Sequence, residues 1–81
     1  MTLDQAPLHQ LFWISHLSHP SNQEQTEQLR QLEAIGFFPH EQVMVLNKGL
    51  LKGDAMVIRV GASTFALRPS EAAMVVVQAQ N

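Results

Sequence analysis

The sequence predicts a mostly β domain: a small, partly open β-barrel with one to two short helices, the first inserted after the first strand. Three observations favour this fold class. Short apolar segments recur along the chain, one amphipathic segment at 21–36 interrupts them, and 81 residues suffice for a single domain, 1–81. Regularly spaced short strands around one core are typical of small barrels.

The first predicted element is a strand over residues 10–17, which is rich in aromatic and apolar residues. Side chains of a strand alternate between two faces. One face then carries Phe12, Ile14 and His16, and the other carries Leu11, Trp13 and Leu17. If Phe12 and Ile14 face the core, Trp13 points outward, either beside the helix or toward a partner. Exposed tryptophans are enriched at binding hot spots, which makes Trp13 a candidate contact residue.

The helix is predicted within residues 21–36. Ser21 followed by Glu24 is a capping-box pattern. An apolar stripe follows at helical spacing: Leu29, Leu32 and Ile35. Gly36 stands just past this stripe, where a left-handed residue commonly ends a helix. A helix this short is stable only if its stripe packs on the sheet.

The corner GFFP, residues 36–39, joins this helix to the next strand. Phe37 and Phe38 are predicted to anchor the helix end on the sheet. Pro39 fixes φ and prevents helical continuation. We therefore favour a structural role for the corner over a functional one.

Four further strands are predicted in the segments 41–48, 54–61, 63–68 and 72–78. Alternation places Val43 and Val45 on one side of the first of these. It places Met56, Ile58 and Val60 on one face of the second. The last strand is expected to leave an open edge, and pairing of such edges would produce a homo-oligomer of unspecified size.

The segment ALRPSEA, residues 66–72, predicts a turn before the last strand. Arg68 ends a strand, Pro69 begins the turn, and Ser70 is placed to cap it. Glu71 is placed to pair with Arg68. The segment is either a purely structural turn, which we favour, or part of a contact surface with Arg68 as a candidate contact residue.

Composition excludes several function classes. The formal net charge is −2 with five Lys and Arg, so neither a nucleic-acid surface nor an RNA-binding barrel is expected. The chain has no cysteine and thus neither a disulfide framework nor a thiolate site. No signal-peptide pattern opens the sequence, and its longest apolar run, AAMVVV, is too short for membrane insertion. We expect a cytoplasmic protein.

Candidate metal ligands are His16 and His19, spaced as H-x-x-H. Residues three apart in a strand lie on opposite faces, so the two would converge only if the chain turned after Leu17. A tight site for ferrous iron or zinc needs three or four ligands, and the nearest carboxylates in sequence are Glu24 and Glu27. We expect no cofactor, with weak binding of Fe²⁺ or another divalent metal as the alternative.

No enzymatic activity is expected. A catalytic nucleophile needs a base and an orienting group within reach. Serines lie near the histidines between residues 15 and 21, but such serines are common in loops. Asp4 and Asp54 have neither a paired carboxylate nor a Gly-rich phosphate loop beside them.

Two blocks of the sequence resemble the FeoA-like domain family. LRQLEAIGFFPHEQVMVL, residues 29–46, resembles the family block rL..lGl.pG..v.v, and residues 53–77 resemble gdp..v.v.g...aLr..ea..i.v. The most specific pieces are IGFFP and ALRPSEA, and the resemblance spans residues 3–77. His9 and His40 stand where the family tends to have Gly, which implies a positive φ that His adopts with some strain.

The resemblance implies an SH3-like barrel and the role of a small cytosolic accessory protein in bacterial ferrous iron uptake. The implied partner is the cytosolic part of the membrane ferrous iron transporter FeoB. The protein would be a non-catalytic module that docks on this transporter and regulates it. The alternative is a metal-binding or metal-sensing domain, similar to the C-terminal domain of metal-dependent repressors. The chain has no helix-turn-helix, so it is not a free-standing repressor.

The loop KGLLKGD, residues 48–54, is the most promising docking segment. Leu50 and Leu51 lie between two glycines, and adjacent leucines at a hairpin tip do not easily both fold back into the core. At least one is expected to be exposed, which would mark a contact site. Packing across the barrel mouth is the equally weighted alternative. The candidate partner-binding residues are Trp13, Leu50, Leu51, Lys52 and Arg68.

Overall fold

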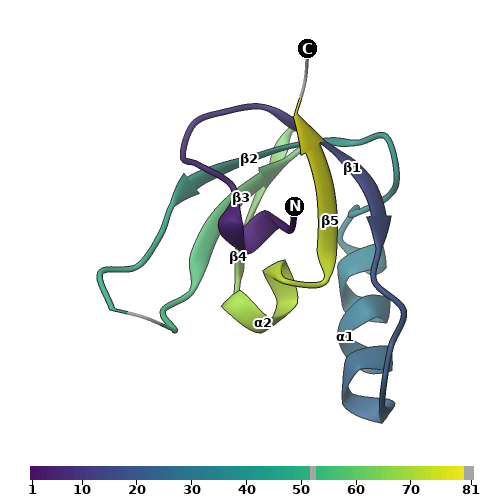
Figure 1. Ribbon diagram of the computed structural model, residues 1–81. Coiled ribbons are helices and arrows are strands. Elements are labelled where there is room, and N and C mark those ends of the chain that lie inside the picture. The colour runs from purple at the N-terminus through teal and green to yellow at the C-terminus, as the bar shows by residue number, and fades with distance from the viewer. Residues whose placement is uncertain (52, 80–81) are drawn as a thin grey trace.

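The computed structural model describes residues 1–51 and 53–79 (Figure 1). Its elements are a 3₁₀ turn η1 (Leu3–Gln5), β1 (Phe12–Leu17), α1 (Gln23–Ala34), β2 (Gln42–Asn47), β3 (Met56–Val60), β4 (Ser63–Leu67), α2 (Pro69–Ala72) and β5 (Val75–Ala79). The predicted mostly β fold, with a helix after the first strand and a second short helix, is confirmed. The candidate residue Lys52 lies outside the described residues.

All five strands form one antiparallel sheet in the order β4-β3-β2-β1-β5, which curls around the core (Figure 1). The strands contribute these buried side chains to the core: Phe12, Ile14, Val43, Val45, Met56, Ile58, Val60, Leu67, Val75 and Val77. The inward faces predicted for the segments 41–48 and 54–61 are therefore confirmed. Because β4 and β5 are the two ends of the order, the barrel is partly open, as expected.

A β-bulge in β1 changes the predicted alternation. Ile14 pairs with Val77 and His16 with Val76, so Ser15 is an extra residue in this strand. Past the bulge the two faces exchange, since Leu17 packs against the core and His16 is exposed. The prediction that His16 shares a face with Ile14 is wrong for this reason. The alternation predicted for the residues of β1 before the bulge is confirmed.

The start of α1 differs from the predicted one by one residue. Asn22 is the N-cap: its Oδ1 accepts a hydrogen bond of 2.8 Å from the backbone N–H of Gln25. Ser21 instead donates its own backbone N–H to Gln25 Oε1 at 2.7 Å. The capping box assigned to Ser21 and Glu24 is thus wrong.

Neither helix within the described ranges has the length and apolar character that crossing a bilayer requires.

The apolar stripe of α1 packs on the sheet as predicted. Its residues Leu29, Leu32 and Ile35 all contact the core. Gly36 follows with a φ of +106°, and the next N–H, that of Phe37, donates to Leu32 O at 3.0 Å. Phe37 is completely buried, whereas Phe38 is 49% exposed. Only one of the two predicted aromatic anchors therefore seals the helix end.

The two histidines at the family's Gly positions have positive φ, as the resemblance implies: +61° at His9 and +75° at His40. His40 donates its N–H to Ile14 O at 2.8 Å, and Ile14 donates to Glu41 O at 2.9 Å. This is the hydrogen-bond pattern of a bulge whose first residue is normally Gly. His9 differs in having a side-chain partner, because its Nε2 lies 3.0 Å from Leu46 O.

Residues at the N-terminus lie along the outer edge of β5. Val77 donates its N–H to Met1 O at 2.9 Å, and Thr2 pairs with Val76 (Figure 1). The expectation that the last strand leaves an open edge is therefore wrong for this stretch. In the part of the chain that the structure describes, the edge without a neighbouring strand lies at the other end of the sheet, on β4.

Candidate docking surface

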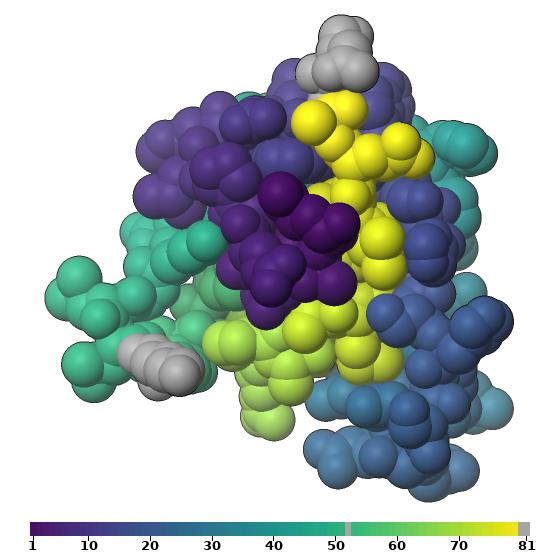
Figure 2. All heavy atoms as spheres, viewed as in Figure 1, coloured from purple at the N-terminus to yellow at the C-terminus, as the bar shows by residue number. Residues whose placement is uncertain are grey.

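The described residues of the loop between β2 and β3, 48–51 and 53–55, present two adjacent leucines to solvent, and we call this segment the leucine loop. Leu50 is 101% exposed and Leu51 is 74% exposed. The loop projects from the barrel in the ribbon diagram, and the space-filling drawing from the same side shows it protruding (Figures 1 and 2). The expectation that at least one leucine is exposed is confirmed, and packing of the pair across the barrel mouth is excluded. Burial of such exposed leucine side chains by a partner would stabilise the complex.

Asp54 holds the leucine loop in its conformation. Its Oδ2 accepts a hydrogen bond of 3.1 Å from the N–H of Leu51, and its own N–H donates to Leu51 O at 3.1 Å. Gly49 leaves the space that this side chain occupies, since a Cβ at residue 49 would lie 1.9 Å from Asp54 Cβ. These contacts link Asp54 to Leu51 and Gly49, so the described part of the loop has a defined shape that displays its leucines.

A hollow of about 380 Å³ lies beside the leucine loop. Outside the loop it is lined by Asp4 of η1, Met56 of β3 and Pro69 of α2. Three elements thus meet at the base of the loop. The leucines and this hollow form one surface on which a partner's apolar side chain can be covered on more than one side.

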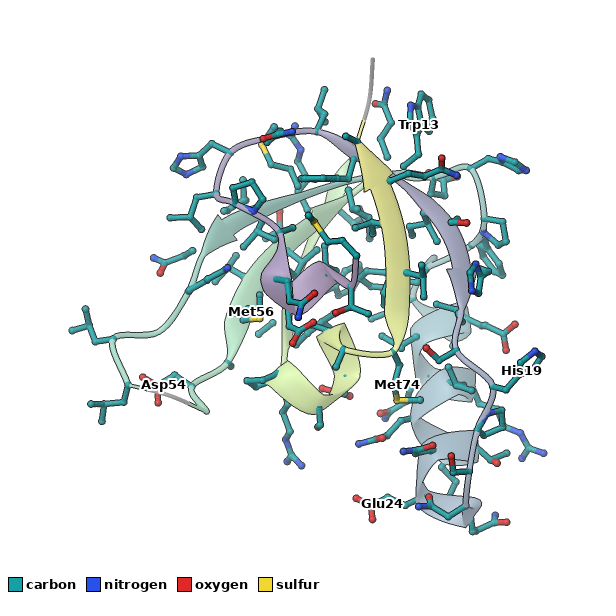
Figure 3. All side chains as sticks on the ribbon, viewed as in Figure 1. Trp13, His19, Glu24, Asp54, Met56 and Met74 are labelled. Carbon is teal, nitrogen blue, oxygen red and sulfur yellow. The ribbon has the colours of Figure 1, made fainter. Side chains whose placement is uncertain are left out.

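Trp13 lies elsewhere on the molecule. It is partly buried and lines a second hollow of about 530 Å³ with Ser15, His40 and Gln78. Figure 3 places Trp13 at the top of the view, far from Asp54 at the foot of the leucine loop. Trp13 and the leucine loop therefore belong to two separate surfaces.

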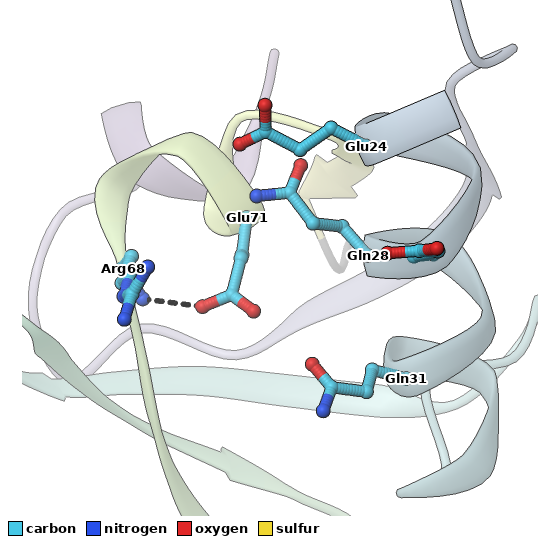
Figure 4. Close-up of a pocket in the computed structure, with 6 residues that line it drawn as sticks. Glu24, Gln28, Gln31, Arg68 and Glu71 are labelled. Carbon is cyan, nitrogen blue, oxygen red and sulfur yellow. Dashed lines mark hydrogen bonds between the residues drawn. The ribbon is translucent and has the colours of Figure 1, made fainter. Parts of the chain in front are cut away.

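Arg68 borders a third hollow, of about 440 Å³, between α1 and α2 (Figure 4). Arg68 is the N-cap of α2 and Pro69 its first residue, so the capping role expected of Ser70 is wrong. Glu71 does bind Arg68, but its carboxylate accepts from the backbone N–H at 2.8 Å. Glu24 and Glu27 also line this hollow, which makes it acidic and unsuited to an anionic ligand.

His16 and His19 are both exposed (Figure 3 labels His19). His16 Nδ1 lies 3.1 Å from Ser15 Oγ. Among residues 1–51 and 53–79, no group of three or more His, Asp and Glu side chains gathers where it could hold a metal ion. The residues present do not fit a tight metal site, which needs three or four ligands.

Sequence reasoning did not anticipate Phe38 or Asp54 as features of the surface. The exposure of Phe38 has no separate sequence signal, because its neighbour Phe37 has the same chemistry. The role of Asp54 does have a sequence signal: an acidic residue three positions after another residue can accept a hydrogen bond from that residue's N–H, as the second residue of a capping box does.

The sequence matches the FeoA domain family over residues 1–79. This chain belongs to the FeoA family. A similar solved structure is the FeoA of Stenotrophomonas maltophilia, with 35% identity and a TM-score of 0.78, covering 96% of this chain and 89% of that one. It is described as an SH3 domain protein complexed with zinc. The SH3-like fold expected for this FeoA chain is therefore confirmed.

Other solved structures extend the comparison. Iron(II) transport protein A from Clostridium thermocellum is 25% identical, with a TM-score of 0.83, and the match covers 98% of this chain and 45% of that one. A manganese-dependent transcriptional repressor shares the fold alone, at 15% identity and a TM-score of 0.83 over 99% of this chain and 41% of that one. Among curated proteins, none is similar enough to count as a match.

Proposed function

We propose that this FeoA chain is a cytosolic accessory protein of bacterial ferrous iron uptake. It docks on the cytosolic part of the membrane transporter FeoB and regulates transport without catalysing a reaction. Membership of the FeoA family supports the iron-uptake context, as does the name iron(II) transport protein A given to a similar structure. The exposed leucine pair is the observation that carries the docking step.

The leucine loop is the proposed anchor. Full burial of a leucine side chain contributes about 1.5–3 kcal/mol, so two of them provide much of the free energy of a weak, regulated complex. The bonds between Leu51 and Asp54 order the loop before binding, which lowers the conformational entropy lost on association. Trp13, Lys52 and Arg68 remain proposed contacts, with Trp13 on a separate surface.

The test is a binding titration between this chain and the purified cytosolic domain of FeoB. We expect the double variant Leu50→Asp, Leu51→Asp to bind at least about 100-fold more weakly, because each change removes an apolar contact and buries a charge. The matched control is Leu8→Asp, which changes another exposed leucine, 46% exposed, on a different part of the chain. Binding of the folded double variant at wild-type affinity would disprove the leucine anchor.

The alternative is a metal-binding or metal-sensing role, and one observation favours it: the S. maltophilia relative was crystallised with zinc. His16 and His19 are the candidate ligands. An anaerobic titration with Fe²⁺ or Zn²⁺ separates the two functions. Micromolar binding that is lost in the double variant His16→Ala, His19→Ala supports the alternative, and binding weaker than millimolar eliminates it.

A further inference from the structure

Within residues 1–51 and 53–79, no strand pairs with the outer edge of β4. β4 is the last strand of the sheet order, and β3 is its neighbour. Gly61, with a φ of +56°, and Ala62 form the two-residue turn that joins these strands, so Val60 and Ser63 exchange hydrogen bonds. Hydrogen-bonded and non-hydrogen-bonded pairs alternate along an antiparallel ladder. The N–H and C=O groups of Thr64 and Ala66 therefore point away from β3.

This edge lacks the features by which proteins usually prevent edge pairing. β4 reads STFAL, with neither a charged residue nor a proline. At the opposite end of the sheet, the backbone of Met1 and Thr2 bonds to β5. One end of the sheet is thus covered by the chain itself, and the other is left suited to a further strand.

We propose that two copies of this chain pair through β4, antiparallel and about a two-fold axis at Phe65. In this register Thr64 of each copy lies opposite Ala66 of the other, and about four backbone hydrogen bonds form. Phe65 is partly buried against its own core and pairs with Ile58, whose side chain is on the inward face. The two Phe65 rings meet on that face, so each covers the exposed part of the other.

Charge favours a second copy over another occupant. In the proposed register Arg68 of one copy lies opposite Ala62 of the other, at the Gly61–Ala62 turn. The Glu41 carboxylate stands at this turn, since a Cβ on Gly61 would lie 3.5 Å from Glu41 Oε2. The exposed Arg68 side chain thus approaches an acidic group of the partner copy twice, once on each side of the axis.

Sedimentation of the full chain over a range of protein concentrations tests the proposal. We expect a weak dimer in wild type, since so small an interface is typical of transient contacts. Thr64→Pro removes an outward N–H without breaking a bond to β3, and it should weaken the dimer at least about 10-fold. Thr64→Val is the matched control, because it keeps the N–H and the β-branched shape.

Two further variants keep the proposal testable if Thr64→Pro fails to fold. Arg68→Glu should weaken the dimer, and the exchange variant Glu41→Arg, Arg68→Glu should restore it, which a purely structural role of either residue would not produce. A wild-type chain that is monomeric at millimolar concentration would overturn the proposal. So would a dimer that survives in folded Thr64→Pro, or one that is lost in the Leu50→Asp, Leu51→Asp variant instead.

Discussion

Asp54 and Leu51 are joined by two hydrogen bonds of 3.1 Å, one to the Asp54 carboxylate and one from its backbone N–H. The pair closes the turn that displays the leucines. Because both residues are exposed, these bonds contribute more to the shape of the loop than to the stability of the domain.

Replacing Asp54 by Ala should therefore separate binding from folding. We expect the melting temperature to fall by no more than about 8 °C, since an exposed hydrogen bond contributes about 0.5–1 kcal/mol. Affinity for the FeoB cytosolic domain should fall about 5–10-fold, because the loop must then be ordered on binding. Calorimetric titration measures both affinity and enthalpy, and an unchanged affinity would show that loop order does not matter.

His40→Gly should stabilise the domain. A non-glycine residue at a φ of +75° is strained by about 1 kcal/mol or more, part of which is offset by the greater flexibility of Gly in the unfolded chain. We expect a rise in melting temperature of about 2–6 °C. His9→Gly is the informative comparison: it should gain less or lose stability, since it also removes the contact between His9 Nε2 and Leu46 O. Equal effects at both positions would contradict this explanation.

The two adjacent phenylalanines should respond very differently to truncation. Phe37→Ala removes a completely buried ring and should cost about 3–5 kcal/mol, which is a large part of the stability of a domain of this size. Phe38→Ala removes a ring that is 49% exposed and should cost less than about 1 kcal/mol. Urea unfolding measures both. A comparable loss of stability in the two variants would mean that Phe38 is also an anchor.

The start of α1 gives a similar contrast between neighbours. Asn22→Ala removes the acceptor for the Gln25 N–H and should destabilise the domain by about 1 kcal/mol. Ser21→Ala leaves its backbone N–H bonded to Gln25 Oε1 and should have almost no effect. Thermal melts followed by circular dichroism distinguish the two. The reverse order would restore the capping role to Ser21.

Much of the fold can be predicted from the sequence because its signals are local. The apolar stripe of α1 and the shared inward face of Val43 and Val45 each follow from a single period. The bulge at Ser15 cannot be found this way, because it is defined by the pairing of β1 with β5, which is distant in sequence. Nor can the coverage of β5 by Met1, which depends on how the two ends of the chain meet.

The candidate site was only partly predictable. The place of Leu50 and Leu51 between two glycines at a hairpin tip predicts that at least one of them is exposed, but it does not exclude packing across the barrel mouth. The separation of Trp13 from this loop does not, because it depends on the curvature of the whole sheet. The predicted pairing of Arg68 with Glu71 is confirmed, but the bonding atom of Arg68 is its backbone nitrogen, which no residue pattern specifies.

Ferrous iron uptake in cells tests the docking account most directly. Cells lacking this chain would be supplied with the wild-type chain, the Leu50→Asp, Leu51→Asp variant or the Leu8→Asp control, and uptake would be measured at low ferrous iron. The FeoB level would be measured in parallel. We predict that the wild type and the control restore uptake, whereas the double variant does not, at equal FeoB levels. Full uptake with the folded double variant would contradict the claim that the leucine loop couples this chain to the transporter.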